Sequence, residues 1–219
     1  IDLDLLNEID MSTVDTIAYY ERPLIKQLRQ LYSGQGIEYN KLTTKQVLEQ
    51  QLGANRISRR KLKSFNHHLS HAAAGFQTSP YDKATVVVID AIGEWDTISI
   101  WGAEYVDGYA KYKKLWSQKY PHSIGLFYSA MTQKAGLKPN EEEYILMGMA
   151  AYGEADRCQA DLQSKFVQDI EQVRFRENLH AGLPSGSFYD VSDRDLAAGT
   201  QALTERLIRS VMHRAQLLV

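Results

Sequence analysis

The sequence contains a single cysteine and no apolar run long enough to cross a membrane as a helix. One cysteine, Cys158, excludes an internal disulfide and suits a reducing compartment. The first residues have neither the basic start nor the apolar middle of a signal peptide. These absences predict a cytoplasmic protein without a membrane partner.

The chain also has no excess of one charge. It carries 25 Lys and Arg against 27 Asp and Glu, a formal net charge of −2, so electrostatics gives no reason to expect nucleic acid as a partner. With 219 residues and 44% hydrophobic content, the chain is long enough for one or two domains around a sizeable core. It lacks an initiator Met and ends abruptly, so we expect a piece of a longer protein whose missing part is a partner. Nothing in it predicts an oligomeric state.

Histidine, in contrast, is locally abundant. Three of the six histidines fall within five residues, at His67, His68 and His71. On a helix, His67 and His71 lie on one face, one turn apart. Asp90 closes the β-branched run at residues 84–89, which is typical of a buried strand. Two imidazoles and a carboxylate suit a divalent metal such as zinc, iron or manganese. The spacing thus predicts a metal site, with capping or core histidines as the alternative.

Hydrophobic periodicity predicts an α/β protein. Residues 84–118 alternate around an Asp107-Gly108 turn and predict a β-meander. Ser64 or Asn66 is expected to cap the histidine helix. A further strand is expected at 13–20. Helices are expected at 1–11, 24–31, 42–53, 67–76 and 124–135. Residues 155–219 are expected to be mostly helical and to end in a helix over 193–218. A basic cluster at residues 56–63 is expected to be an exposed connection, with an anion or phosphate contact near the site as the alternative.

Five motifs follow one another between residues 15 and 153. They are Tyr-Tyr-Glu-Arg-Pro-Leu, Asn-His-His-Leu-Ser-His-Ala-Ala, Ile-Asp-Ala-Ile-Gly-Glu-Trp, Ser-Ile-Gly-Leu-Phe-Tyr-Ser-Ala and the stretch from Glu143 to Gly153. In order and spacing they resemble the O-carbamoyltransferases of the nodulation-protein, cephalosporin and aminoglycoside type.

This resemblance implies a fold and an activity. Residues 1–219 would form a single incomplete Kae1-like domain of the actin/Hsp70/sugar-kinase superfold, a partial lobe with a mixed β-sheet and flanking helices. A YrdC-like domain and a further carboxylate ligand would lie outside this chain, which by itself would be inactive. The full protein would make carbamoyl-adenylate from carbamoyl phosphate and ATP. It would then transfer the carbamoyl group to a hydroxyl of a small-molecule or glycan acceptor.

The resemblance also implies roles for individual residues. By position, His67, His71 and Asp90 match the family's ligands for Fe, Mn or Zn. His68 is the candidate catalytic residue, contacting a phosphate or the acceptor, with helix capping as the alternative. The candidate nucleotide-binding residues are Gly125, Glu143 and Gly148.

Two positions depart from the family pattern. Ala91 stands where a Gly follows the ligand Asp, and Ile145 stands where a Lys could contact a phosphate. A catalytically inactive homologue that binds a nucleotide or a partner is therefore an alternative. A metallohydrolase is another alternative, which would need a general base near the metal. Glu94 is the nearest candidate, and its other interpretation is a structural turn residue.

Overall fold

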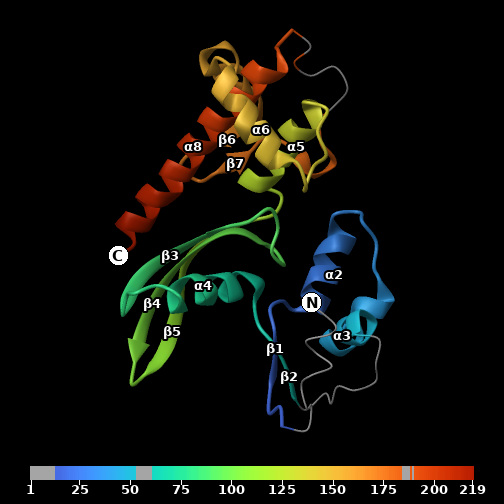
Figure 1. The fold of residues 1–219 in the computed structure, drawn as a ribbon, viewed down its shortest axis with the longest axis vertical. Coiled ribbons are helices and arrows are strands. Elements are labelled where there is room, and N and C mark those ends of the chain that lie inside the picture. Colours follow the sequence, from blue (N-terminus) through green and yellow to red (C-terminus); the bar gives the residue numbers. More distant parts are fainter. Residues whose placement is uncertain (1–12, 53–60, 184–187, 189) are drawn as a thin grey trace. The chain divides into compact units, whose positions relative to one another are not determined.

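The computed structural model describes residues 13–52, 61–183, 188 and 190–219 (Figure 1). The helix predicted at 1–11 and most of the basic cluster at 56–63 lie outside the described residues. The chain forms two compact units: unit 1 comprises residues 1–75 and 93–95, and unit 2 comprises residues 76–92 and 96–219. The predicted α/β class is confirmed. Among the described strands, parallel and antiparallel pairs belong to separate sheets rather than to one mixed sheet.

Unit 1 is built on a short parallel strand pair. Strand β1 (Ile17–Tyr19) pairs with β2 (Leu62–Ser64), placing Ile17 opposite Leu62. The unit's helical elements are α2 (Pro23–Tyr32), the 3₁₀ turn η1 (Tyr39–Lys41), α3 (Thr44–Leu52) and most of α4 (His67–Gln77). Its apolar core consists of buried Tyr19, Val47 and Leu48, with Ile17 and Leu62 packed against them.

Several polar side chains of unit 1 are buried. Among the residues of this unit that the structure describes, six polar or charged ones are buried, namely Glu21, Gln27, Arg29, Thr44, His68 and Glu94. Buried polar groups must be hydrogen-bonded to be tolerated. Polar contacts among these described residues therefore contribute to the stability of unit 1.

Helix α2 has its apolar side outward. Leu24, Leu28 and Leu31 are 52%, 47% and 53% exposed, whereas Gln27 and Arg29 are buried. The helix predicted at 24–31 is confirmed, and it begins at Pro23, a residue favoured in the first turn. Its polar side faces the interior of unit 1, which is the reverse of an ordinary surface helix.

Unit 2 contains the predicted β-meander. Strands β3 (Lys83–Ile89), β4 (Asp96–Val106) and β5 (Tyr109–Lys119) form an antiparallel sheet in that order. The turn between β4 and β5 places Asp107 at φ 52° and Gly108 at φ 78°. Both residue types tolerate this left-handed backbone, which explains why the hairpin was readable from sequence.

The remainder of unit 2 is mostly helical. It contains α5 (Ile124–Lys134), α6 (Glu143–Met149), α7 (Gln159–Phe166), α8 (Asp193–Leu217), the 3₁₀ turns η3 (Ala150–Tyr152), η4 (Ala155–Arg157) and η5 (Leu179–Ala181), and strands β6 (Val167–Asp169) and β7 (Arg174–Phe175). The mostly helical region expected at 155–219 is interrupted after Phe166 by β6 and β7. There the chain turns back, because the Asp169 carboxylate accepts the Gln172 N–H at 2.9 Å and Val173 adopts φ 50°.

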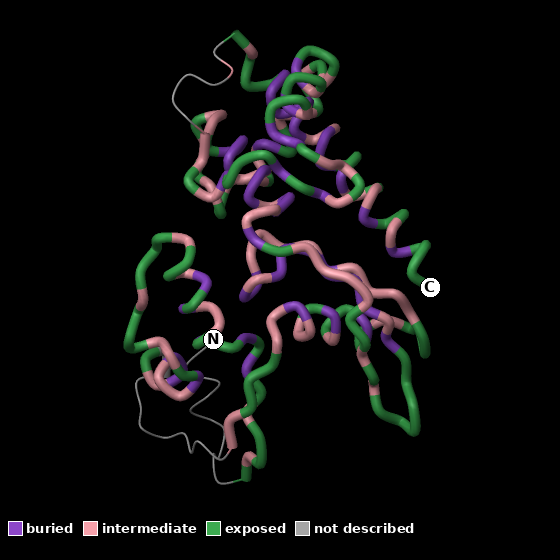
Figure 2. The backbone as a smooth tube through the Cα atoms, turned by 180° about the vertical axis from the view of Figure 1, so that it is seen from behind, coloured by how far each residue is buried: buried purple, intermediate pink, exposed green. Residues whose placement is uncertain are grey.

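The core of unit 2 is large and apolar. Buried positions recur along α8 (Figure 2). They follow one side of the helix and include Leu196, Leu203, Leu207 and Val211. These residues belong to the same apolar cluster as Phe127. Within the described part of the chain, every helix is too short or too polar to span a bilayer.

Candidate metal centre

Helix α4 carries the histidines and begins where the sequence predicts. The side-chain oxygen of Asn66 accepts the Leu69 N–H at 3.0 Å, so Asn66 is the N-cap. The Ser70 hydroxyl donates to the Tyr20 carbonyl at 2.9 Å. That bond ties the histidine-bearing face of α4 to the segment that follows β1.

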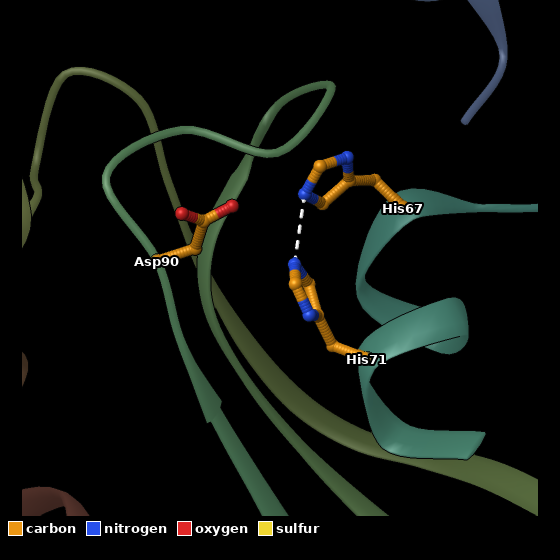
Figure 3. Close-up of side chains that lie close together, drawn as sticks. All are labelled: His67, His71 and Asp90. Carbon is orange, nitrogen blue, oxygen red and sulfur yellow. Dashed lines mark hydrogen bonds between the residues drawn. The ribbon is translucent and has the colours of Figure 1, made fainter. Parts of the chain in front are cut away.

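His67 and His71 converge as their spacing predicts. Their Nε2 atoms lie 3.0 Å apart and their ring centroids 4.7 Å apart (Figure 3). His67 is partly buried and His71 is exposed. Two imidazole nitrogens that point toward the same position can both coordinate one transition-metal ion. The helix thus supplies both donors without any rearrangement of its backbone.

The acidic residue Glu21 lies behind His67. Its Oε2 is 3.7 Å from His67 Nδ1, and its Oε1 accepts a hydrogen bond from the Lys26 ammonium at 3.0 Å. Burial raises the pKa of the Glu21 carboxyl, but hydrogen bonds and charge from His67 and Lys26 outweigh burial and hold that pKa below its usual range. The Glu21 carboxylate therefore faces Nδ1 of His67, whereas Nε2 is the proposed metal-binding nitrogen.

Glu21 was missed from the sequence as a site residue. It lies within the Tyr-Tyr-Glu-Arg-Pro-Leu motif, 46 residues before His67, and long-range contacts such as the parallel pairing of β1 with β2 bring the two segments together. Its place inside a family motif was the one available signal.

Asp90 ends strand β3 of unit 2 and is held locally. Its backbone N–H donates to the Thr97 carbonyl at 2.9 Å, and its Oδ1 accepts the Ala91 N–H at 2.7 Å. The Ser123 hydroxyl, which caps α5, donates to the Ala91 carbonyl at 2.7 Å. The turn that presents Asp90 is therefore braced by the start of α5.

The donor chemistry of these residues fits a divalent transition metal. His67, His71 and Asp90 each offer one ligand atom, two imidazole nitrogens and one carboxylate oxygen. A metal-binding histidine usually donates its other ring N–H to a carboxylate or carbonyl, which fixes the tautomer. Glu21 is positioned to accept that N–H from His67, so the metal interpretation fits the surroundings as well as the ligands.

His68 lies on α4 between the pair but is fully buried. Burial favours the alternative of a structural histidine over contact with a diffusing substrate. A catalytic role for His68 stays a prediction.

The three candidate nucleotide-binding residues lie in unit 2. A Cβ added to Gly125 would come 2.7 Å from the Ala91 Cα, whereas one added to Gly148 would meet nothing within 4 Å. The Glu143 carboxylate accepts the Ser129 hydroxyl and the Asn140 N–H, each at 2.6 Å. Gly125 thus allows a close backbone approach to the Asp90 turn, and Glu143 organises the start of α6. Nucleotide binding by these residues stays a prediction.

Glu94 is not available as a general base. It is 2% exposed, and its carboxylate accepts the Arg22 backbone N–H at 2.7 Å, the Arg22 Nε–H at 2.9 Å and the Asn66 amide at 3.2 Å. The interpretation of Glu94 as a structural turn residue is confirmed. The hydrolase alternative loses the base on which it depended.

Comparison with known proteins agrees with the motifs. A family model described as the carbamoyltransferase N-terminus matches residues 3–213. An uncharacterized protein of Synechocystis, sll1178, is 37% identical over 91% of this chain and 38% of its own length. Nodulation protein NolNO of Sinorhizobium fredii is 25% identical over 93% of this chain and 31% of its own length.

Both relatives are longer proteins, and this chain covers 38% of the length of the first and 31% of the length of the second. The family match itself covers nearly the whole chain. The chain therefore belongs to the carbamoyltransferase family and corresponds to its N-terminal region.

Proposed function

We propose that the full-length protein is an O-carbamoyltransferase. It would transfer a carbamoyl group from carbamoyl-adenylate, formed from carbamoyl phosphate and ATP, to a hydroxyl of a small-molecule or glycan acceptor. Membership of the family supports carbamoyl transfer, and the single cysteine suits a cytoplasmic setting.

The proposed metal ligands from this chain are His67, His71 and Asp90, with Fe, Mn or Zn as the ion. When bound, the metal would polarise the carbamoyl carbonyl and stabilise negative charge on its oxygen. The role of this chain would be to hold the metal-binding atoms in position. The cap at Asn66 sets the start of α4, and the helix holds the two Nε2 atoms 3.0 Å apart.

Glu21 and Lys26 orient the first of these donors. The Glu21 carboxylate lies 3.7 Å from His67 Nδ1, so its charge would favour the proton on Nδ1 and leave the Nε2 lone pair for the metal. The Lys26 ammonium holds Glu21 in place and balances its charge. The carboxylate thereby raises the basicity of the imidazole without being exposed to solvent.

One observation carries the proposal: two imidazole Nε2 atoms meet on one helix face, within a chain that matches the family over residues 3–213. The acceptor class and the carbamoyl-adenylate intermediate rest on the resemblance alone.

A second candidate is an inactive homologue that binds a nucleotide or a partner. Ile145, where the family pattern has a cation, is partly buried in α6. Replacing a Lys by an apolar side chain there removes a possible phosphate contact.

The test uses the full-length protein supplied with ATP and carbamoyl phosphate. We expect one equivalent of Fe, Mn or Zn by elemental analysis, and carbamoylation of an acceptor hydroxyl by mass spectrometry. The variants His67→Ala, His71→Ala and Asp90→Ala should each lose the metal and the activity. His213→Ala is the matched control, because His213 is exposed on α8.

Each outcome discriminates between the candidates. Metal content and turnover that survive in all three variants would remove the metal-site assignment. ATP binding by calorimetry without any turnover would favour the inactive homologue.

A further inference from the structure

Glu94 is a buried carboxylate that contacts two other segments of unit 1. It lies in the connection between β3 and β4, and residues 93–95 of that connection belong to unit 1. It bonds to Arg22, which precedes α2, and to Asn66, which precedes α4. Neutral groups are enough to stabilise a turn, whereas a buried carboxylate is costly unless charge and hydrogen bonds compensate it. A buried carboxylate at this position therefore indicates a role beyond the turn itself.

Arg22 compensates the charge of Glu94 and is held by it. The Arg22 backbone N–H donates to Glu94 Oε1 at 2.7 Å, and the Arg22 Nε–H donates to Oε2 at 2.9 Å. A further guanidinium nitrogen, Nη2, contacts the same Oε2. Charge-assisted bonds from a guanidinium to both carboxylate oxygens fix the geometry more closely than a single contact does. The backbone bond also fixes the peptide that links Glu21 to Arg22.

Asn66 receives its orientation from the same carboxylate. Its Nδ2 donates to Glu94 Oε2 at 3.2 Å, and its Oδ1 accepts the Leu69 N–H at 3.0 Å. An ionised carboxylate only accepts hydrogen bonds, so it selects the amide orientation with Nδ2 toward Glu94 and Oδ1 toward the helix. Glu94 thus favours the orientation that caps α4, whose first residue is His67.

The two contacts of Glu94 flank the pair formed by Glu21 and His67. One residue bonded to Glu94 directly follows Glu21, and the other directly precedes His67. On the other side of Glu21, the Tyr20 carbonyl accepts the Ser70 hydroxyl at 2.9 Å. The segment that carries Glu21 is therefore tied to α4 on both sides. Since Glu21 Oε2 lies 3.7 Å from His67 Nδ1 and the interaction weakens with distance, this spacing has to be maintained.

We propose that Glu94 is a positioning residue of the candidate metal centre. Through Arg22 and Asn66, it holds the two segments together. The Glu21 carboxylate is thereby kept at a fixed separation from the His67 ring. The proposal rests on the proposed function, because it concerns the group that orients a metal-binding histidine. Without the Glu94 carboxylate, His67 Nε2 would be a weaker metal donor although every ligand residue is unchanged.

The first test is a double-mutant cycle on Zn²⁺ affinity, measured in the full-length protein by competition with a chelator. Glu94→Gln keeps the shape of the side chain but removes its charge and one acceptor. We expect Glu94→Gln and Glu21→Gln each to weaken Zn²⁺ binding by about 10-fold or more, the usual effect of losing a group behind a ligand histidine. The double variant should bind Zn²⁺ within about twofold of the weaker single variant, because Glu94 has nothing left to position once Glu21 is replaced.

Two control variants of unit 1 separate positioning from stability. Val47→Ala removes part of the apolar core of this unit, and Glu49→Gln removes a carboxylate that pairs with Lys45 on α3. Urea titrations of the metal-free proteins measure how far each variant is destabilised. We expect both controls to keep the Zn²⁺ affinity of the wild type.

Arg22→Gln takes the place of Glu94→Gln if the latter does not fold. The Arg22 side chain is 47% exposed, and the variant keeps the backbone N–H that bonds to Glu94. It should weaken Zn²⁺ binding by a smaller factor than Glu21→Gln does.

A second measurement needs no metal. Histidine-selective nitrogen labelling gives the NMR signals of the His67 ring in the metal-free protein, with the exposed His213 as the internal reference. Glu94→Gln should move the His67 signals in the same direction as Glu21→Gln does and leave those of His213 unchanged. If the wild-type protein binds no Zn²⁺, the metal assignment fails, and the His67 signals still test whether Glu94 positions Glu21.

The proposal is overturned if Glu94→Gln binds Zn²⁺ as tightly as the wild type, or if the losses from Glu94→Gln and Glu21→Gln multiply in the double variant. It is also overturned if Val47→Ala, at equal destabilisation, weakens Zn²⁺ binding as much as Glu94→Gln, or if the His67 ring signals do not move.

Discussion

At the scale of single residues, the least expected feature is the carboxylate behind His67. Sequence spacing found both imidazoles, because an i and i+4 pair on a helix needs no tertiary information. It could not find Glu21, which reaches His67 through the pairing of β1 with β2. Local patterns thus predict ligands on one element, while the groups that orient them depend on long-range contacts.

Glu21→Gln is expected to weaken metal binding about 10- to 100-fold, the usual effect of losing a carboxylate behind a ligand histidine. The amide no longer attracts the Nδ1 proton, so His67 Nε2 becomes a poorer donor. Competition with a chelator of known affinity measures the change. Glu104→Gln, which removes a surface carboxylate paired with Lys83, is the control and should bind metal normally. Equal affinity in both variants would contradict the orienting role.

His122 provides a pH prediction away from the proposed metal site. Its pKa lies below the usual value, because burial and then the charge of Arg174 disfavour the imidazolium. The unfolded chain therefore binds this proton more tightly than the folded chain does. The stabilising contribution is complete above about pH 6.5 and is lost as the pH falls toward the lower folded pKa.

We expect His122→Asn to reduce this loss. Asn retains an acceptor for the Phe175 N–H, which reaches His122 Nδ1 at 3.2 Å, but does not titrate. Melting temperatures of both proteins between pH 5 and pH 7 measure the difference. If the variant and wild type lose stability in parallel over that interval, His122 does not contribute.

At the scale of elements, the sequence predicted local periodicity well and long-range pairing poorly. Residues 67–77, 83–119 and 193–217 follow their expected patterns because each is capped or alternates clearly. Strand β2 was missed, since its three residues carry no alternation and pair only through β1. The mostly helical region expected at 155–219 is interrupted after Phe166, because Val173 adopts φ 50° and the Asp169 carboxylate accepts the Gln172 N–H.

The cap of α4 can be tested directly. Asn66→Ala removes the acceptor for Leu69 and the donor to Glu94, so we expect a loss of about 1 kcal/mol or somewhat more in unfolding free energy. Asn66→Ser keeps the cap but not the contact to Glu94. A denaturant titration should place Asn66→Ser between the wild type and Asn66→Ala, and an order that reverses this would show that capping is not the main contribution.

Two glycines predicted to bind a nucleotide differ in their surroundings. Gly125→Ala is expected to destabilise the protein by about 1–3 kcal/mol, because the new Cβ meets the Ala91 backbone. Gly148→Ala, within α6 and next to open space, should be neutral or stabilising by up to about 1 kcal/mol. Chemical denaturation measures both. Because Gly148→Ala is expected to fold, any loss of nucleotide affinity in it would reflect contact with the ligand.

At the scale of the whole molecule, the described residues of the two units bury different groups. Unit 2 buries an extensive apolar cluster, whereas the described part of unit 1 buries a smaller apolar cluster beside several polar groups. The histidine pair lies on α4, in unit 1.

The proposed ligand set combines His67 and His71 of α4 with Asp90 at the end of β3. A metal held by all three would stabilise the folded protein, by about 2.7 kcal/mol when its free concentration is 100 times its dissociation constant. Hydrogen exchange with and without Zn²⁺ should therefore show slower exchange in α4 and also in the turn after β3. Asp90→Asn should abolish the change after β3 and weaken that in α4. Protection confined to α4 in the wild type would mean that the histidines bind the ion without Asp90, and that the carboxylate belongs to some other part of the reaction.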